Sequence, residues 1–358
     1  VKRFVDTLLS SKKPLFVFGE ILRANDEAAK LAHKLLSLAN GAYINAYRQF
    51  DVIPESKRCG GYLSITNAPH ISAALEASNI FVIGHHISPE LTENYLNYKI
   101  GSNITAHVYP SNEGKCYPGA CITPEERRFD IFTGKQKIDS DICLFLKAAI
   151  KELRERGVKP HEEIAEWVKD LRSQQITFST TLKEGDLFSA AIVKLAEVAY
   201  FEPGADNFLI SDSGANARQF SKISYKHNSF GGSPGRAMTY SCGDIGAYFG
   251  LKHSGLTGRI FSTKGDGSFD MGPRKMIWTN NMVRCVFDSD GFGAVIDAHG
   301  GNVHPDISRR GIEREDIPSA IAAGSRGAVS VKVISSVDQL GDLDRLERNK
   351  PHFLYFTK

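Results

Sequence analysis

Short apolar runs alternate with amphipathic segments along the whole chain, and this alternation constrains the fold more than any other feature. The apolar runs of the first half are Leu15–Phe18, "AYINAY", "NIFVIGHH" and "ITAHVYP". Those of the second half are "NFLIS", "RIFSTK", "MVRCVF", "GAVSVKVI" and "HFLYFTK". Helical patterns such as "APHISAALEAS" and "GAYFGLKHSG" separate them. Strands that alternate with helices form parallel sheets. The sequence therefore predicts the α/β class, with two doubly wound parallel-sheet domains.

The domain organisation follows from length and local composition. A chain of 358 residues favours two domains, each large enough to bury a core. The first domain is predicted over residues 1–175, with an irregular excursion at about 110–138 that is rich in Pro, Gly, Cys and charge. The stretch "ITFSTTLKEGD" predicts a linker at 176–185, and the second domain takes residues 186–358. In the first domain, "NDEAAKLAHKLLSLANG" reads as a helix with Asn25 as its N-cap and Gly41 just past its end.

Charge and hydropathy exclude several classes of partner. The formal net charge is only +3 and the basic residues are scattered, which gives no reason to expect nucleic acid or an anionic membrane surface. No apolar run approaches the roughly 18 residues of a membrane span, and no charged-then-apolar leader opens the chain. We expect a cytoplasmic protein.

The cysteines and glycines exclude two common kinds of site. Six cysteines are spaced without the paired Cys or His pattern of a zinc site, so we expect free thiols. No strand is followed by Gly-x-Gly-x-x-Gly, and Gly-x-x-x-x-Gly-Lys-Ser/Thr is absent as well. An NAD-linked oxidoreductase is therefore disfavoured.

Two apolar strands end in acidic, glycine-rich turns, Gly265-Asp266-Gly267 and Asp288-Ser289-Asp290-Gly291. Ligands of open α/β sheets bind beyond the carboxyl ends of the strands. Glycines let the backbone approach a phosphate, but a carboxylate there repels the phosphate unless a cation lies between them. Magnesium suits that position because it binds carboxylates and phosphate oxygens together. The local interpretation is a Mg-diphosphate site; the alternative is that Gly-Asp-Gly is simply a tight turn.

These turns and their surroundings resemble the thiamine diphosphate (ThDP) enzymes of the pyruvate decarboxylase and acetolactate synthase group. "GDGSFDM" matches the first part of their cofactor signature, and "VFDSDGFG" stands where their Asn-Asn turn occurs. "ISDSGANARQF" and "SCGDIGAYFGLK" resemble earlier segments of their diphosphate-binding (PP) domain, and "KKPLFVFGE" and "ALEASNIFVIGHH" are similar to their middle domain. The resemblance covers essentially the whole chain. It implies ThDP and Mg²⁺ as cofactors.

Site residues follow from the resemblance position by position. Asp266 would bind Mg²⁺ through its carboxylate, Ser289 falls at the usual side-chain ligand, and Gly291 would offer its carbonyl. Ile245 matches the bulky residue that supports the bent cofactor; the alternative for it is plain core packing. The remaining residues expected near the cofactor are Gly214, Ala215, Asn216, Gly243, Gly265, Gly267 and Ser268.

The second turn departs from the family pattern. Asp288, Ser289 and Asp290 replace the asparagine pair, and the spacing from Asp266 is about four residues short, roughly one helical turn. Either Asp288 or Asp290 takes over as a metal ligand, which a hard cation accepts, or the site has lost its function. We expect the first, because Gly-Asp-Gly-Ser-Phe is kept.

The resemblance also implies a partner. The family's pyrimidine-binding (PYR) domain, which carries the glutamate that activates the cofactor, has no counterpart here. We therefore expect the PP-domain subunit of a two-component ThDP-dependent 2-oxo acid decarboxylase or carboligase, forming a heterotetramer with a separate PYR chain, unless the sequence is a fragment of a longer enzyme. His299 and His304 are candidates for contact with a small 2-oxo acid substrate, with surface histidines as the alternative. The other function considered is a non-catalytic or regulatory subunit with a degenerate metal site.

Overall fold

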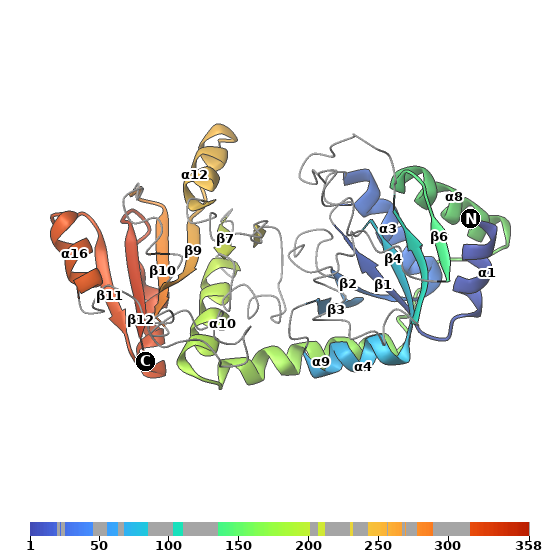
Figure 1. The fold of residues 1–358 in the computed structure, drawn as a ribbon, viewed down its shortest axis with the longest axis horizontal. Helices are drawn as coiled ribbons and strands as arrows, with labels where there is room; N and C mark the ends of the chain where they lie inside the picture. The colour runs from blue at the N-terminus through green and yellow to red at the C-terminus, as the bar shows by residue number, and fades with distance from the viewer. Residues whose placement is uncertain are drawn as a thin grey trace, which may run out of the picture. The chain divides into compact units, whose positions relative to one another are not determined.

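The computed structural model divides into two compact units, Val1–Phe178 and Ser179–Lys358 (Figure 1). Each unit is a parallel β-sheet with helices on both faces. The residues that the structure describes are 1–19, 22, 26–45, 56–63, 68–84, 103–109, 135–200, 207–211, 230–231, 243–255, 257–266, 269, 278–288 and 316–357.

The first unit has a six-stranded sheet in the order β3-β2-β1-β4-β5-β6. Every neighbouring pair is parallel, which requires a crossover connection for each. The two central strands, β1 and β4, are almost entirely buried, as expected for strands covered on both faces. The strands are β1 (Pro14–Phe18), β2 (Ala42–Asn45), β3 (Cys59–Tyr62), β4 (Asn79–Ile83), β5 (Ile104–Val108) and β6 (Gln136–Ile138).

The two faces of this sheet have separate hydrophobic cores. Alternate side chains of β1 point to opposite faces: Phe16 and Phe18 pack with one group of helices, Leu15 and Val17 with the other. The first core is closed by α1 (Lys2–Ser10), α3 (Asp26–Ala39) and α8 (Ile142–Glu155). The second is closed by α4 (Pro69–Ala77) and by the first part of α9 (Glu166–Lys183).

The end of α3 differs in detail from the predicted glycine cap. The residue with a left-handed backbone is Asn40, at φ 47°, rather than Gly41. The amide of Gly41 donates to the carbonyl of Leu36 at 3.2 Å, which is the longer bond of a Schellman motif. Gly41 is required for space instead, because a Cβ there would lie 2.7 Å from the carbonyl oxygen of Pro14. Asn25, the predicted N-cap, lies outside the described residues.

The second unit has a six-stranded sheet in the order β11-β12-β10-β9-β7-β8, again parallel throughout. The strands are β7 (Phe208–Ser211), β8 (Phe230–Gly231), β9 (Ile260–Gly265), β10 (Met282–Asp288), β11 (Ser330–Ile334) and β12 (His352–Thr357). The prediction of two parallel-sheet α/β domains is therefore confirmed.

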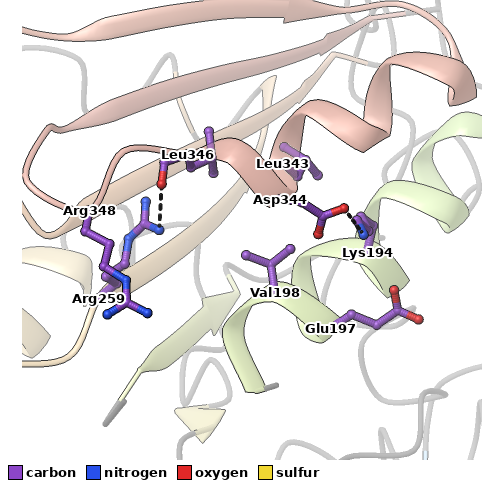
Figure 2. A pocket seen from close by; sticks show the side chains of 8 residues that line it. All are labelled: Lys194, Glu197, Val198, Arg259, Leu343, Asp344, Leu346 and Arg348. Atoms are coloured by element: carbon purple, nitrogen blue, oxygen red, sulfur yellow. Dashed lines mark hydrogen bonds and ion pairs between the residues drawn. The ribbon is translucent and has the colours of Figure 1, made fainter. Parts of the chain in front are cut away.

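Different helices cover the two faces of the second sheet. α12 (Gly243–His253) and α16 (Asp316–Gly324) pack on the face that carries Met282 and Val286. α10 (Leu187–Tyr200) packs on the opposite face, where the ring centroids of Phe188 and Phe287 lie 5.4 Å apart. The 3₁₀ segment η3 (Val337–Arg345) lies against α10 (Figure 2).

Two segments that were predicted to be irregular contain regular secondary structure. Helix α9 continues through Lys183, so most of the segment 176–185 proposed as a linker is helical, and the boundary between the units falls inside α9. The last three residues of the predicted excursion, Gln136–Ile138, form β6 beside β5. Among the described residues, no helix has the length and apolar character needed to cross a membrane.

Candidate active site

Three segments singled out from the sequence follow three adjacent strands. β7, β9 and β10 are neighbours in the second sheet and run in parallel, so their carboxyl ends meet at one edge. β9 ends at Gly265 and leads into Asp266, and β10 ends at Asp288. β7 ends at Ser211, three residues before the segment 214–216. This edge is where ligands of open α/β sheets bind.

Asp266 and Asp288 come to equivalent places on neighbouring strands. Gly265 pairs with Phe287 in the parallel register, so each aspartate is the next residue along its strand. Both are buried, with exposed fractions of 5% and 0%. Buried carboxylates need a cation or hydrogen-bond donors around them. Asp266 and Asp288, two of the three carboxylates that the sequence offers as metal ligands, thus lie at the same edge of the sheet.

Asp288 has a partner that the sequence did not reveal. The hydroxyl of Tyr355, on β12, donates a hydrogen bond to Oδ2 of Asp288, and both side chains are buried. Strand β12 lies directly beside β10, and Val286 is opposite Tyr355 in the register. Tyr355 is therefore a diagonal neighbour of Asp288, which lies two residues further along β10. A hydrogen bond of this kind fixes the orientation of a carboxylate.

A buried charge cluster joins α12 to the same face of the sheet. Asp244, in the first turn of α12, accepts a hydrogen bond from Nε of Arg284 at 2.6 Å and lies 3.6 Å from Nζ of Lys264. Lys264 precedes Gly265 on β9, and Arg284 lies on β10. One carboxylate therefore faces two cations within this cluster. Lys264 and Arg284 lie on the same face of the sheet as Asp266 and Asp288.

This cluster places the N-terminal end of α12 beside the end of β9. Gly243 and Ile245, both predicted to lie near the cofactor, flank Asp244, and Ile245 is half-buried. Arg284 also stacks on the ring of Trp278, 4.7 Å from its centroid. Sequence reasoning missed Asp244, Lys264, Arg284 and Tyr355. The available signal was a lysine and an arginine inside two predicted strands, Lys264 in "RIFSTK" and Arg284 in "MVRCVF".

The predicted site residues divide into two groups. Gly243, Ile245, Gly265, Asp266 and Asp288 are described and belong to the second unit. Within the described part of the chain, no group of three or more His, Cys, Asp or Glu side chains is arranged to hold a metal. The predicted residues outside the described ranges are Gly214, Ala215, Asn216, Gly267, Ser268, Ser289, Asp290, Gly291, His299 and His304.

Three cysteines lie in described segments, and all are free thiols. Cys285, on β10, is fully buried on the face opposite Asp288, and burial raises the pKa of its thiol. Because the thiolate is the reactive form, Cys285 is an inert core residue.

Two parallel-sheet α/β units in one chain are consistent with the fold of ThDP-dependent enzymes. Among solved structures, the chain is similar to benzoylformate decarboxylase from Polynucleobacter necessarius, with a TM-score of 0.64 and 17% sequence identity. The match covers 99% of this chain and 63% of that one. No protein-family model and no curated protein matches the sequence. The likeness at this identity is one of fold.

Proposed function

We propose that this chain is the PP-domain subunit of a two-component ThDP-dependent 2-oxo acid decarboxylase or carboligase. One observation carries the proposal. The segments that resemble the ThDP signature follow three adjacent parallel strands of the second unit, in a chain whose fold is like that of a ThDP-dependent decarboxylase.

The described residues fit a magnesium ion and a diphosphate. Asp266 and Asp288 offer hard oxygen donors at one sheet edge, and Mg²⁺ characteristically binds one or two carboxylates and completes its shell with water and phosphate oxygens. Two carboxylates are therefore a sufficient protein contribution. Lys264 and Arg284 add positive charge on the same face, which favours an anionic ligand there.

Each residue has a distinct part in this proposal. Asp266 would bind the metal, and Asp288 would be a second ligand held in orientation by Tyr355. Asp244 would hold the first turn of α12, with Ile245, against the strand ends. ThDP, when bound, supplies a nucleophilic carbon that attacks the keto group of a 2-oxo acid and accepts the electrons left when CO₂ departs. The chain's own residues supply orientation and electrostatics.

The PYR component is proposed from the sequence resemblance, which covers the middle and PP domains of the family; it would be a separate chain, or a further part of a longer enzyme to which these residues belong. The activating glutamate would come from a PYR chain, with two copies of each chain as the minimum assembly. His299 and His304 remain predictions for contact with the substrate carboxylate or for proton transfer. The proposed substrate is a small 2-oxo acid.

A test is to purify the chain from its native cells, measure the mass of the intact complex, and assay CO₂ release from pyruvate and benzoylformate. We expect a second polypeptide in equal amount and CO₂ release that requires both ThDP and Mg²⁺. Asp266→Ala should assemble but release no CO₂, whereas Asp338→Ala, an exposed aspartate in η3, should be active. A chain that decarboxylates as a homomer contradicts the two-component proposal.

One observation favours a second candidate function. The hydrogen bond from Tyr355 also suits Asp288 as a purely structural carboxylate, in a turn that lacks the family's asparagines. The corresponding function is a non-catalytic subunit with the same fold. A chain that assembles with its partner and binds no ThDP would identify it.

A further inference from the structure

One guanidinium nitrogen of Arg284 is not satisfied by the contacts of the buried charge cluster. Arg284 is only 2% exposed, and its Nη1 atom is buried with no hydrogen-bond partner in the part of the chain that the structure describes. A buried donor without an acceptor raises the free energy of the folded state, and a charged donor does so more strongly. An acceptor from outside the chain would therefore bind favourably at Nη1.

The guanidinium group of Arg284 is held in place through its other atoms. Nε donates to Oδ2 of Asp244 at 2.6 Å, and the guanidinium carbon lies 4.7 Å from the centre of the Trp278 ring. The nitrogens of a guanidinium have a fixed planar arrangement, so these two contacts also fix the position of Nη1. A ligand that binds to Nη1 does not have to order the arginine first, which favours binding.

The same guanidinium group lies at the amino end of α12. Asp244, which binds Nε of Arg284, belongs to the first turn of this 11-residue helix, and its Oδ1 accepts from the amide of Ile245 at 2.9 Å. The amides at the start of a helix have no partner within the helix, and the helix dipole places a partial positive charge there. A helix start and a buried guanidinium donor thus occur at one place, and each of them favours an anion.

This place is close to the candidate metal site but distinct from it. Arg284 lies on the face of the sheet that carries Asp266 and Asp288, four residues before Asp288 on β10. At about 3.3 Å per residue, the Cα atoms of Arg284 and Asp288 are roughly 13 Å apart along the strand. An anion at Arg284 therefore leaves the two aspartates free to bind the metal.

We propose that Arg284 and the first turn of α12 form a subsite for a phosphate group, whose oxygens accept hydrogen bonds from Nη1 and from the helix start. A phosphate suits this place better than a carboxylate, because its additional oxygens reach both sets of donors together. The group is either the terminal phosphate of ThDP, in which case the inference rests on the proposed function, or a free phosphate bound beside the cofactor.

Trp278 provides the readout, because the guanidinium of Arg284 lies over its ring. The chain, with any chain that accompanies it, is titrated with inorganic phosphate in EDTA in a Trp167→Phe background, and chloride keeps the ionic strength constant. We expect a saturable change in Trp278 fluorescence. Arg284→Lys keeps a positive charge beside Asp244 but lacks Nη1, so phosphate affinity should fall about tenfold through loss of a charge-assisted hydrogen bond.

Arg345→Lys is the matched control, at an exposed arginine of η3, and should leave the phosphate affinity unchanged. The urea midpoint shows whether each variant folds. If Arg284→Lys does not fold, Arg284→Met combined with Asp244→Asn removes the guanidinium together with its counter-charge and should bind no phosphate. An unchanged phosphate affinity in the folded Arg284 variant, an equal loss in Arg345→Lys, or no saturable change in the parent chain would overturn the subsite.

Addition of ThDP with Mg²⁺ to the phosphate-bound chain distinguishes the two sources of the phosphate group. Displacement of phosphate by ThDP assigns the subsite to the cofactor, and simultaneous binding assigns it to a free phosphate; both results support the subsite. A chain that binds phosphate through Arg284 but binds no ThDP contradicts the proposed function and leaves the subsite standing. A chain that binds ThDP but shows no phosphate binding that depends on Arg284 contradicts the subsite alone.

Discussion

Nε of Arg284 donates to Oδ2 of Asp244 at 2.6 Å, and the two side chains are only 2% and 1% exposed. The pair connects the first turn of α12 to the middle of β10, and Lys264 of β9 approaches the same carboxylate at 3.6 Å. Three elements around the candidate site are thereby held by one buried aspartate. Its loss removes the counter-charge of the buried Arg284 and one of the partners of Lys264.

Asp244→Asn should therefore destabilise the second unit strongly. Removing one partner of a buried ion pair costs about 3–5 kcal/mol, because the other charge stays buried. The measurement is urea unfolding followed by Trp278 fluorescence in a Trp167→Phe background. Adding Arg284→Met to Asp244→Asn should recover part of the loss, which gives a non-zero coupling in a double-mutant cycle.

The matched control is the exposed pair of Lys332 and Asp342, which lie 3.4 Å apart in the same unit. Ion pairs at the surface contribute about 0–1 kcal/mol to the free energy of unfolding, so Asp342→Asn should change that free energy little. If Asp244→Asn and Asp342→Asn have equal effects, Asp244 does not hold these elements together.

Tyr355→Phe tests the hydroxyl that orients Asp288. Loss of a residue that hydrogen-bonds a metal ligand typically weakens metal binding about 10–100-fold, and we expect that range for Mg²⁺ in the presence of saturating ThDP. Tyr248→Phe, on α12, removes a tyrosine hydroxyl elsewhere in the unit and should leave the Mg²⁺ affinity unchanged. An unchanged affinity in Tyr355→Phe would mean that Asp288 is no metal ligand.

The first unit should lose stability as the pH falls through about 6.5. Burial lowers the pKa of His70 below 6.5, against smaller opposing effects of its bonds to Gln175 and the Gly60 backbone. Burial lowers the pKa of His33 in the same direction. The unfolded chain therefore takes up protons first, so stability is fully present above pH 6.5 and declines below it.

Urea midpoints at pH 8, 7, 6 and 5, read from Trp167 in a Trp278→Phe background, measure this decline. His70→Gln should flatten it, because glutamine cannot take up a proton. His161→Gln, at an exposed histidine of the same unit, serves as the control and should not flatten it. A His70→Gln profile that still falls as steeply as the parent would assign the decline to other groups.

Two glycines should respond in opposite ways to alanine. At Gly41 a Cβ would lie 2.7 Å from the oxygen of Pro14 and 2.9 Å from the ring of Phe16, so Gly41→Ala should cost about 1–3 kcal/mol. Gly250 is exposed inside α12, where a Cβ meets no described atom within 4 Å. Gly250→Ala should raise the free energy of unfolding by about 0.5–1 kcal/mol, because alanine has the higher helix propensity. In thermal unfolding, the midpoint temperature should fall for Gly41→Ala and rise for Gly250→Ala.

The fold was predictable where strands are apolar and continuous. β1 and β10 are buried runs bounded by glycine or acidic turns, and the sequence located both. β3, "CGGY", was missed because two glycines weaken a strand signal, although Gly61 is needed there. Its φ is +127°, and a Cβ would lie 2.5 Å from Oε1 of Gln175.

The segment before the last strand is helical, but it is a 3₁₀ element rather than an α-helix. Ser336 and Gln339 form a capping box, which is a sound helix-start signal, but the segment that follows is the 3₁₀ element η3. Gly341 lies in its middle, and glycine weakens an α-helix. The short strands β6 and β8 carried no pattern long enough to detect.

Of the candidate site, the sequence could predict only the residues that belong to a local motif. Asp266 stands between two glycines, and Asp288 opens the turn that leads to Gly291; both come at strand ends, so motif and position both indicate them. Tyr355 and Asp244 act through contacts with residues 67 and 40 positions away. Those contacts depend on strand order and on which helix covers which face, and a single sequence does not encode them in a local pattern.

The most direct test of the central claim is calorimetric titration of ThDP into the chain, purified with any chain that accompanies it, with Mg²⁺ and then with EDTA. The proposal predicts saturable binding that requires Mg²⁺, that Asp266→Ala abolishes and that Asp338→Ala retains. No binding of ThDP with Mg²⁺ present, or equal binding in EDTA and in Asp266→Ala, would contradict a metal-dependent diphosphate site at this edge of the sheet.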